Sequence, residues 1–170
     1  MKYSVNDRVV YPGYGVARIS SLVKKAVGVD TLEFFELKFL NKDMTVLVPV
    51  TNPEAVGIRP LSPMKRVSNV FQILAEPARE ISPYELTASN WNKRNKEYQN
   101  KIRRGDLIEL SEIYRDLKHI SQQKELSFGE KTLLQQTEML LAEEISLVEQ
   151  VVPEQAVSQL RSHFISPRIS

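Results

Sequence analysis

The sequence predicts an α+β fold in which a small, strongly bent β-sheet or barrel precedes an all-α helical bundle. Short apolar stretches separated by turn residues fill the first 60 residues, as expected for four or five short strands. From Ser62 onward the apolar residues recur at intervals of three and four, which indicates helices. This change of period divides the 170 residues into two domains of ordinary size.

The strands of the first domain are separated by clear turn signals. The expected strands span 5–11, 16–23, 32–40 and 44–50. The run from Pro12 to Gly15 is a turn because proline fixes φ and glycine tolerates a positive φ. Gly28 opens the next turn, and a polar loop over 41–43 precedes the last strand.

The helices of the second domain carry recognisable start and stop residues. The expected helices span 63–76, 91–104, 107–120, 127–148 and 153–164. Ser62 is expected as the N-cap of the first helix, with Pro63 at its first position. Gly105 ends the second helix, and Ser127 with Glu130 forms a capping box for the fourth.

These elements predict four segments along the chain. They are a β domain over 1–62, a connecting helix and linker over 63–90, a helical domain over 91–165 and a frayed tail over 166–170.

The composition excludes several kinds of chemistry. Hydrophobic residues make up 42% and charged residues 26% of the chain, as in folded globular proteins, and there is no cysteine. The two histidines, His119 and His163, are far apart, so neither a histidine-rich metal site nor a histidine-based triad is expected. No nucleotide-binding glycine loop, nucleophile elbow or zinc-protease motif occurs. We therefore expect no enzyme, metal, cofactor or small-molecule ligand. No apolar run reaches about 20 residues, so no membrane span is expected.

The formal net charge of +2 conceals a local excess of cations. Residues 91–104 contain six cations and a single acid, Glu97. The cations are Lys93, Arg94, Lys96, Lys101, Arg103 and Arg104. A local excess of one sign indicates a specific anionic partner better than the total charge does.

The same segment combines these cations with the only tryptophan of the chain. On a helix, Trp91 shares an apolar stripe with Tyr98 and Ile102, and the cations lie on the other faces. One interpretation is a core stripe with a solvated back. The other is a nucleic-acid contact, in which the cations neutralise phosphates and the indole presses on a base step from the minor groove.

The near-neutral first domain has a different signature. Strands over 29–38 and 44–50 can leave an edge open to a partner's strand, unless a neighbouring domain protects that edge. The sequence therefore favours a protein partner for this domain.

Several short motifs occur in a fixed order over about three-quarters of the chain. They are V-N-D-R-V-V-Y-P-G-Y-G-V at 5–16, L-V-P at 47–49, V-G-I-R at 56–59, N-W-N-K-R-N-K at 90–96, G-D at 105–106, Y-R-D-L at 114–117 and L-S-F-G-E-K at 126–131. Together they resemble the motifs of the CarD/CdnL family of bacterial RNA polymerase-binding transcription regulators. Because there is neither an AT-hook nor a long acidic tail, the chain is more similar to the short, CdnL-like branch.

The resemblance implies a Tudor-like β domain that docks on the β subunit of RNA polymerase. It also implies a helical domain that contacts the minor groove of promoter DNA at the upstream edge of the transcription bubble and stabilises the open complex. The expected DNA contacts are Trp91, Lys93, Arg94, Lys96, Lys101, Arg103 and Arg104. The expected polymerase contacts are Lys25, Phe35, Leu37 and Leu47. The protein is expected to be a cytoplasmic, nucleoid-associated monomer.

Departures from the family motifs, and two other functions, stay open at this point. Asn6 and Tyr14 replace a usual glycine and histidine, and Leu47 stands where relatives can carry a basic residue, which implies a more apolar polymerase contact. One alternative function is a free-standing architectural nucleic-acid-binding protein. The other is a scaffold whose basic helix docks an acidic protein.

Overall fold

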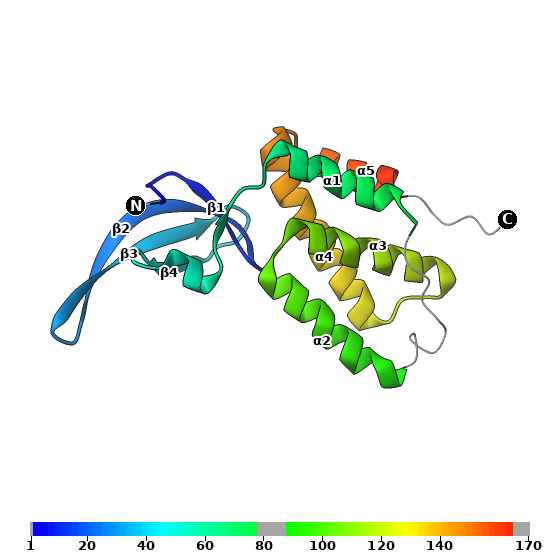
Figure 1. The fold of residues 1–170 in the computed structure, drawn as a ribbon, viewed down its shortest axis with the longest axis horizontal. Helices are drawn as coiled ribbons and strands as arrows, with labels where there is room; N and C mark the ends of the chain where they lie inside the picture. The colour runs from blue at the N-terminus through cyan, green and yellow to red at the C-terminus, as the bar shows by residue number, and fades with distance from the viewer. Residues whose placement is uncertain (1, 78–87, 165–170) are drawn as a thin grey trace. The chain divides into compact units, whose positions relative to one another are not determined.

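The computed structural model describes residues 2–77 and 88–164, which form two compact units (Figure 1). The first unit is Met1–Leu61 and the second is Ser62–Ser170. An antiparallel sheet makes up the first unit and helices make up the second, which confirms the predicted fold class. Most of the expected linker, residues 78–87, and the expected tail lie outside the described residues.

The sheet of the first unit is antiparallel, with strand order β4-β3-β2-β1-β5. Its elements are β1 (Arg8–Tyr11), β2 (Gly15–Val27), β3 (Asp30–Phe39), β4 (Thr45–Pro49), the 3-10 helix η1 (Pro53–Val56) and β5 (Arg59–Pro60). Gly28, with a φ of +63°, begins the two-residue turn between β2 and β3. Because the pairing of β4 with β3 reaches only from Phe34 to Lys38, the β2–β3 hairpin extends beyond the rest of the sheet (Figure 1).

One side of the sheet forms the core of this unit. Phe35 pairs with Val48 across β3 and β4, and Leu37 pairs with Ile19 across β3 and β2. All four side chains are almost completely buried. Successive residues of a strand point to opposite sides, so the intervening β3 residues point away from this core. We call that opposite side the outer face; on β3 it carries Phe34, Glu36 and Lys38.

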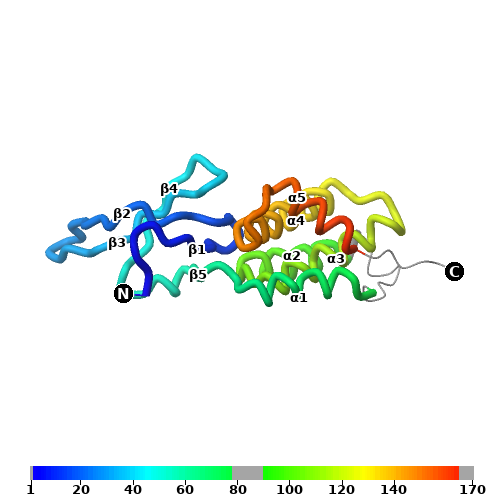
Figure 2. The backbone as a smooth tube through the Cα atoms, turned by 90° about the horizontal axis from the view of Figure 1, so that it is seen from above, coloured from blue at the N-terminus to red at the C-terminus, as the bar shows by residue number. Residues whose placement is uncertain are grey.

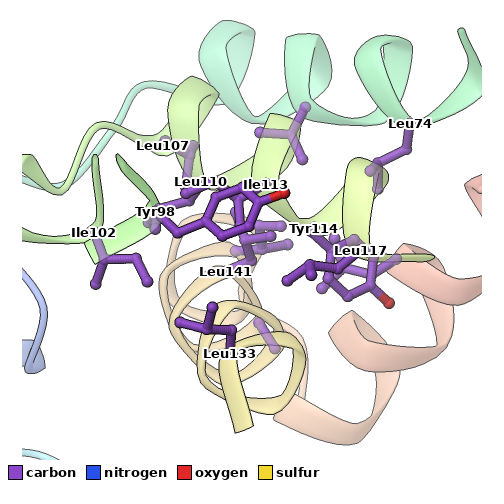
Figure 3. Close-up of a cluster of buried hydrophobic side chains, with 14 of the residues drawn as sticks. Leu74, Tyr98, Ile102, Leu107, Leu110, Ile113, Tyr114, Leu117, Leu133 and Leu141 are labelled. Carbon is purple, nitrogen blue, oxygen red and sulfur yellow. The ribbon is translucent and has the colours of Figure 1, made fainter. Parts of the chain in front are cut away.

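The second unit is a bundle of α-helices. They are α1 (Met64–Ala75), α2 (Ala88–Arg104), α3 (Leu107–Gln123), α4 (Phe128–Glu149) and α5 (Pro153–His163). α3 lies between α1 and α4 and packs against both (Figure 2). Figure 3 shows the core that they enclose, with Tyr98 and Ile102 of α2 facing side chains of α3 and α4. The buried Tyr114 keeps its hydroxyl satisfied by donating a hydrogen bond of 2.6 Å to Glu138.

The ends of these helices follow the sequence signals, with one exception. Ser127 Oγ accepts from the Glu130 N–H at 3.3 Å, and Glu130 accepts from the Ser127 N–H at 3.0 Å, which confirms the capping box. Gly105 ends α2 with a φ of +68°. The prediction for α1 was wrong by one residue, because Pro63 is the N-cap. Ser62 instead donates its backbone N–H to Glu144 at 2.9 Å.

Helix α1, which was expected to connect the two domains, packs in the core of the helical unit. Val67, Val70 and Leu74 of α1 are completely buried in the core that α3 and α4 share. Helix α1 is therefore part of the helical unit, because its apolar stripe is buried in that unit's core.

Candidate nucleic-acid interface

Trp91 lies near the start of α2, partly buried against the helical core. Its ring crosses Gly129 in the first turn of α4, where a β-carbon would lie 2.8 Å from Trp91 Cζ2. Real β-carbons do not approach another atom so closely, so the indole reaches this position only because residue 129 is a glycine. The indole is thus fixed in place, and part of its surface remains exposed.

Arg94, one helical turn after Trp91, is buried rather than turned to solvent. Its guanidinium carbon lies 5.3 Å from the centre of the Trp91 ring, and one terminal nitrogen lies 3.6 Å from a carboxylate oxygen of Glu130. Arg94 was expected to contact phosphates, and this buried placement does not fit that role. The physical reason is the position of Arg94 around the helix. It lies about 300° from Trp91 around the axis of α2, beside the apolar stripe, so its side chain is buried when that stripe packs against the bundle.

The carboxylate of Glu130 connects these groups. Glu130 is 1% exposed; it accepts a hydrogen bond of 2.7 Å from Lys124 and one of 3.0 Å from the Ser127 N–H. Burial by itself raises the pKa of Glu130, but the hydrogen bonds from Lys124 and Ser127 outweigh it and hold the pKa below its usual value. The carboxylate therefore stays charged and holds Arg94 beneath the indole.

The other cations of α2 differ in exposure. Lys93, Lys96 and Arg103 are exposed and make no ion pair with any described residue, and Lys101 is half-buried. Arg104 is exposed and pairs with Glu109 at 3.0 Å. We call Lys93, Lys96 and Arg103 the basic face. These residues lie about 120–160° around the helix from Trp91, so the indole and the basic face occupy different sides of α2.

Gly129 and Glu130 were not among the functional residues expected from the sequence. Both belong to the L-S-F-G-E-K motif at 126–131, and the structure brings this motif against the N-W-N-K-R-N-K motif at 90–96. A glycine inside the first turn of a helix was the available signal, since glycine is unfavourable there unless something approaches closely.

In the first unit, two of the four expected polymerase contacts lie on the outer face. Leu47 pairs with Glu36 and is half-buried, whereas Lys25 pairs with Leu32 of the protruding hairpin and is exposed. Phe35 and Leu37 are 1% and 0% exposed in the core, so neither is available to a partner. Because successive residues of a strand point to opposite sides, Phe35 and Leu37 point into the core, and their neighbour Phe34 points to the outer face.

The part of the chain that the structure describes contains neither a metal-binding cluster nor a membrane-spanning helix. No group of three or more His, Cys, Asp or Glu side chains there is arranged to hold a metal ion. None of the described helices is both long and apolar enough to cross a membrane.

Comparison with known protein families assigns both units. Residues 3–62 match the CarD-like/TRCF RID domain, and residues 69–161 match the CarD C-terminal domain. A chain in which these two modules follow one another is a transcription regulator. The chain belongs to the CarD family.

Two relatives illustrate the similarity. The Bacillus subtilis (strain 168) protein YdeB, which bears a transcription-factor name, is 23% identical over 157 residues, or 92% of this chain and 98% of YdeB. The solution structure of the 72-residue N-terminal domain of Myxococcus xanthus CarD is 37% identical, covers 34% of this chain and 76% of that one, and has a TM-score of 0.29.

Proposed function

We propose that this regulator binds the β subunit of RNA polymerase through its first unit and stabilises the promoter open complex through its helical unit. The DNA contact is to the minor groove at the upstream edge of the bubble and does not depend on base sequence. The observation that carries the proposal is the closely packed, partly exposed indole of Trp91, on a helix whose exposed Lys93, Lys96 and Arg103 form no ion pair with a described residue.

The indole suits the role of a wedge that holds melted duplex open. Apolar side chains inserted from the minor groove unstack base steps, and an aromatic ring also stacks on an exposed base. Trp91 already packs against Gly129 and Arg94, so little side-chain entropy is lost when it meets DNA. Arg94 then acts as a positioning residue for the indole.

The basic face suits contact with phosphates. Lys93, Lys96 and Arg103 carry charge that no described carboxylate neutralises, and Lys101 and Arg104 border them. Contacts of this kind release counterions and give affinity without base preference. The cations and the indole lie on different sides of α2. The duplex backbone therefore contacts the basic face, while the indole contacts the bubble from the N-terminal end of the helix.

The first unit suits a protein partner. Strand β4 is hydrogen-bonded only to β3 and forms one edge of the described sheet, which leaves it open to strand addition. Lys25 and Leu47 share the outer face with Phe34 and Leu32, which gives an apolar patch with a cation at its border. Such a composition is typical of a protein interface.

Binding to polymerase explains why weak DNA contacts are sufficient. A tethered helical unit meets promoter DNA at a high effective concentration, so non-specific contacts act on the DNA that the enzyme already holds. The wedge shifts the equilibrium between closed and open promoter only as far as it binds the open form better.

A pull-down with the polymerase β subunit, with and without nuclease, tests this division of roles. We expect the full chain to be retained after nuclease treatment, because the first unit contacts protein. Loss of retention would favour the free-standing architectural DNA- or RNA-binding protein. If the double variant Lys96→Gln/Arg103→Gln is no longer retained, the result would favour a scaffold whose basic helix docks an acidic protein.

A further inference from the structure

Three cations stand directly opposite one another on adjacent strands of the sheet. Arg8 of β1 pairs with Arg18 of β2, and Arg18 pairs with Lys38 of β3. Directly paired residues of neighbouring strands project to the same side, with strands about 4.8 Å apart. We call Arg8, Arg18 and Lys38 the cationic row.

The cationic row lies on the outer face of the sheet. Lys38 is two residues from Glu36 on β3, so both point away from the core, and Glu36 in turn pairs with Leu47 of β4. On this face the cationic row therefore lies directly beside the pair formed by Glu36 and Leu47, and Phe34 lies beyond that pair. Arg8 and Lys38 are exposed, and Arg18 is half-buried.

This arrangement is unfavourable for the isolated protein. Like charges directly opposite one another on a sheet destabilise the pairing of their strands. No described carboxylate forms an ion pair with any member of the row, and Glu36, the acid on the same face, accepts a hydrogen bond from Ser20 at 2.8 Å. Arg18 is nevertheless held in place, because it donates a hydrogen bond of 3.0 Å to the side chain of Asn6.

We propose that the cationic row receives an acidic surface of the protein that docks on the outer face. This inference rests on the proposed function, in which that protein is the polymerase β subunit. The apolar side chains Leu47 and Phe34 on the same face favour a protein over a nucleic acid, since an apolar centre with a charged border is typical of a protein interface. Charges at such a border act mainly by steering the partner's approach.

The experiment compares single charge-neutralising variants of the full chain in binding to nuclease-treated polymerase β subunit. Arg18→Gln and Lys38→Gln each remove one cation of the row. Lys24→Gln removes the same charge from the opposite side of β2, because Lys24 pairs with Glu33 in the other phase of the strand. Thermal melting of each variant verifies folding, and Lys38→Gln is expected to melt no lower than wild type, since a like-charge contact is relieved.

We expect each row variant to slow association by about two- to fivefold at low salt and to leave dissociation almost unchanged. The difference should shrink as added salt screens the charges. Association rates equal to that of Lys24→Gln would overturn the inference. So would a loss of affinity for duplex DNA without an effect on the β subunit, which would make the row a nucleic-acid contact. If wild type itself does not bind the β subunit, the proposed function fails, and this inference fails with it.

Discussion

The ring of Trp91 lies so close to Gly129 that a β-carbon on residue 129 would be 2.8 Å from Trp91 Cζ2. This contact joins the start of α2 to the start of α4 and fixes the indole without enclosing it. Two motifs that are separate in the sequence therefore form one structural site. Arg94 and Glu130, the next functional residues of the same motifs, lie 3.6 Å apart beneath the indole.

A substitution at Gly129 tests this contact through stability. Glycine to alanine inside a helix normally stabilises by about 0.5–1 kcal/mol. In Gly129→Ala we expect no gain, or a loss, in the free energy of unfolding, because the methyl group displaces the indole. In a Trp91→Ala background the normal gain should return. Denaturant unfolding of the four proteins measures this coupling, and a coupling energy near zero would contradict the contact.

The basic face can be tested through the salt dependence of DNA binding. Lys96→Gln/Arg103→Gln should reduce the slope of log affinity against log salt by about 2, because each lost phosphate contact removes about 0.9. Titrations of duplex DNA at several salt concentrations measure the slope. Lys24→Gln/Lys65→Gln removes the same charge from exposed positions outside α2 and serves as the control. Equal slopes for the two double variants would show that the basic face does not contact phosphates.

The helical unit should lose stability in acid through two carboxylates. Burial by itself raises the pKa of Glu130 and of Glu138. Hydrogen bonds outweigh this effect, from Lys124 and Ser127 to Glu130 and from Arg161 and Tyr114 to Glu138, so both pKa values lie below the usual 4.5. Each group therefore stabilises the fold above pH 4.5, and this contribution is lost as the pH falls through the lowered pKa of the folded state.

Urea unfolding between about pH 7 and pH 3 measures this acid sensitivity. Glu138→Gln should be less stable than wild type at neutral pH and should show a shallower loss of stability in acid. A variant with the wild-type slope would show that Glu138 does not contribute to the pH dependence.

Adjacent residues of β3 point to opposite sides of the sheet, so Phe35 lies in the core and Phe34 on the outer face. Phe35→Ala should destabilise the first unit by about 3–5 kcal/mol, because its ring is completely buried. Phe34→Ala should leave the fold almost unchanged and weaken binding to the polymerase β subunit. Thermal melting and a binding titration distinguish the two effects. Equal destabilisation by both substitutions would mean that Phe34 is not a surface residue.

The sequence predicted the fold well because its signals are local. The capping box at Ser127, the glycine after α2 and the change from strand to helix spacing all act within a few residues. The phase of β3 was not predictable in this way, since Phe34 and Phe35 are adjacent and only the pairing with Val48 shows which one faces the core.

The candidate site was predictable in part for the same reason. Residue types identified Trp91 and the cations of α2, but the burial of Arg94 depends on Glu130 in another helix. The fit of the indole on Gly129 likewise arises only when α2 packs against α4. Contacts between distant segments therefore decide which of the candidate residues remain at the surface.

The lifetime of the promoter open complex in the presence of the Trp91→Ala variant tests the central claim most directly. Stacking of an aromatic side chain on a base is worth about 1–3 kcal/mol, so we expect the complex to decay about fivefold faster, or more, than with wild type. Binding to the polymerase β subunit should remain close to wild type, whereas the melting temperature should fall, because the indole packs against the helical core. An open complex that decays at the wild-type rate, with the variant folded and bound to polymerase, would contradict the account.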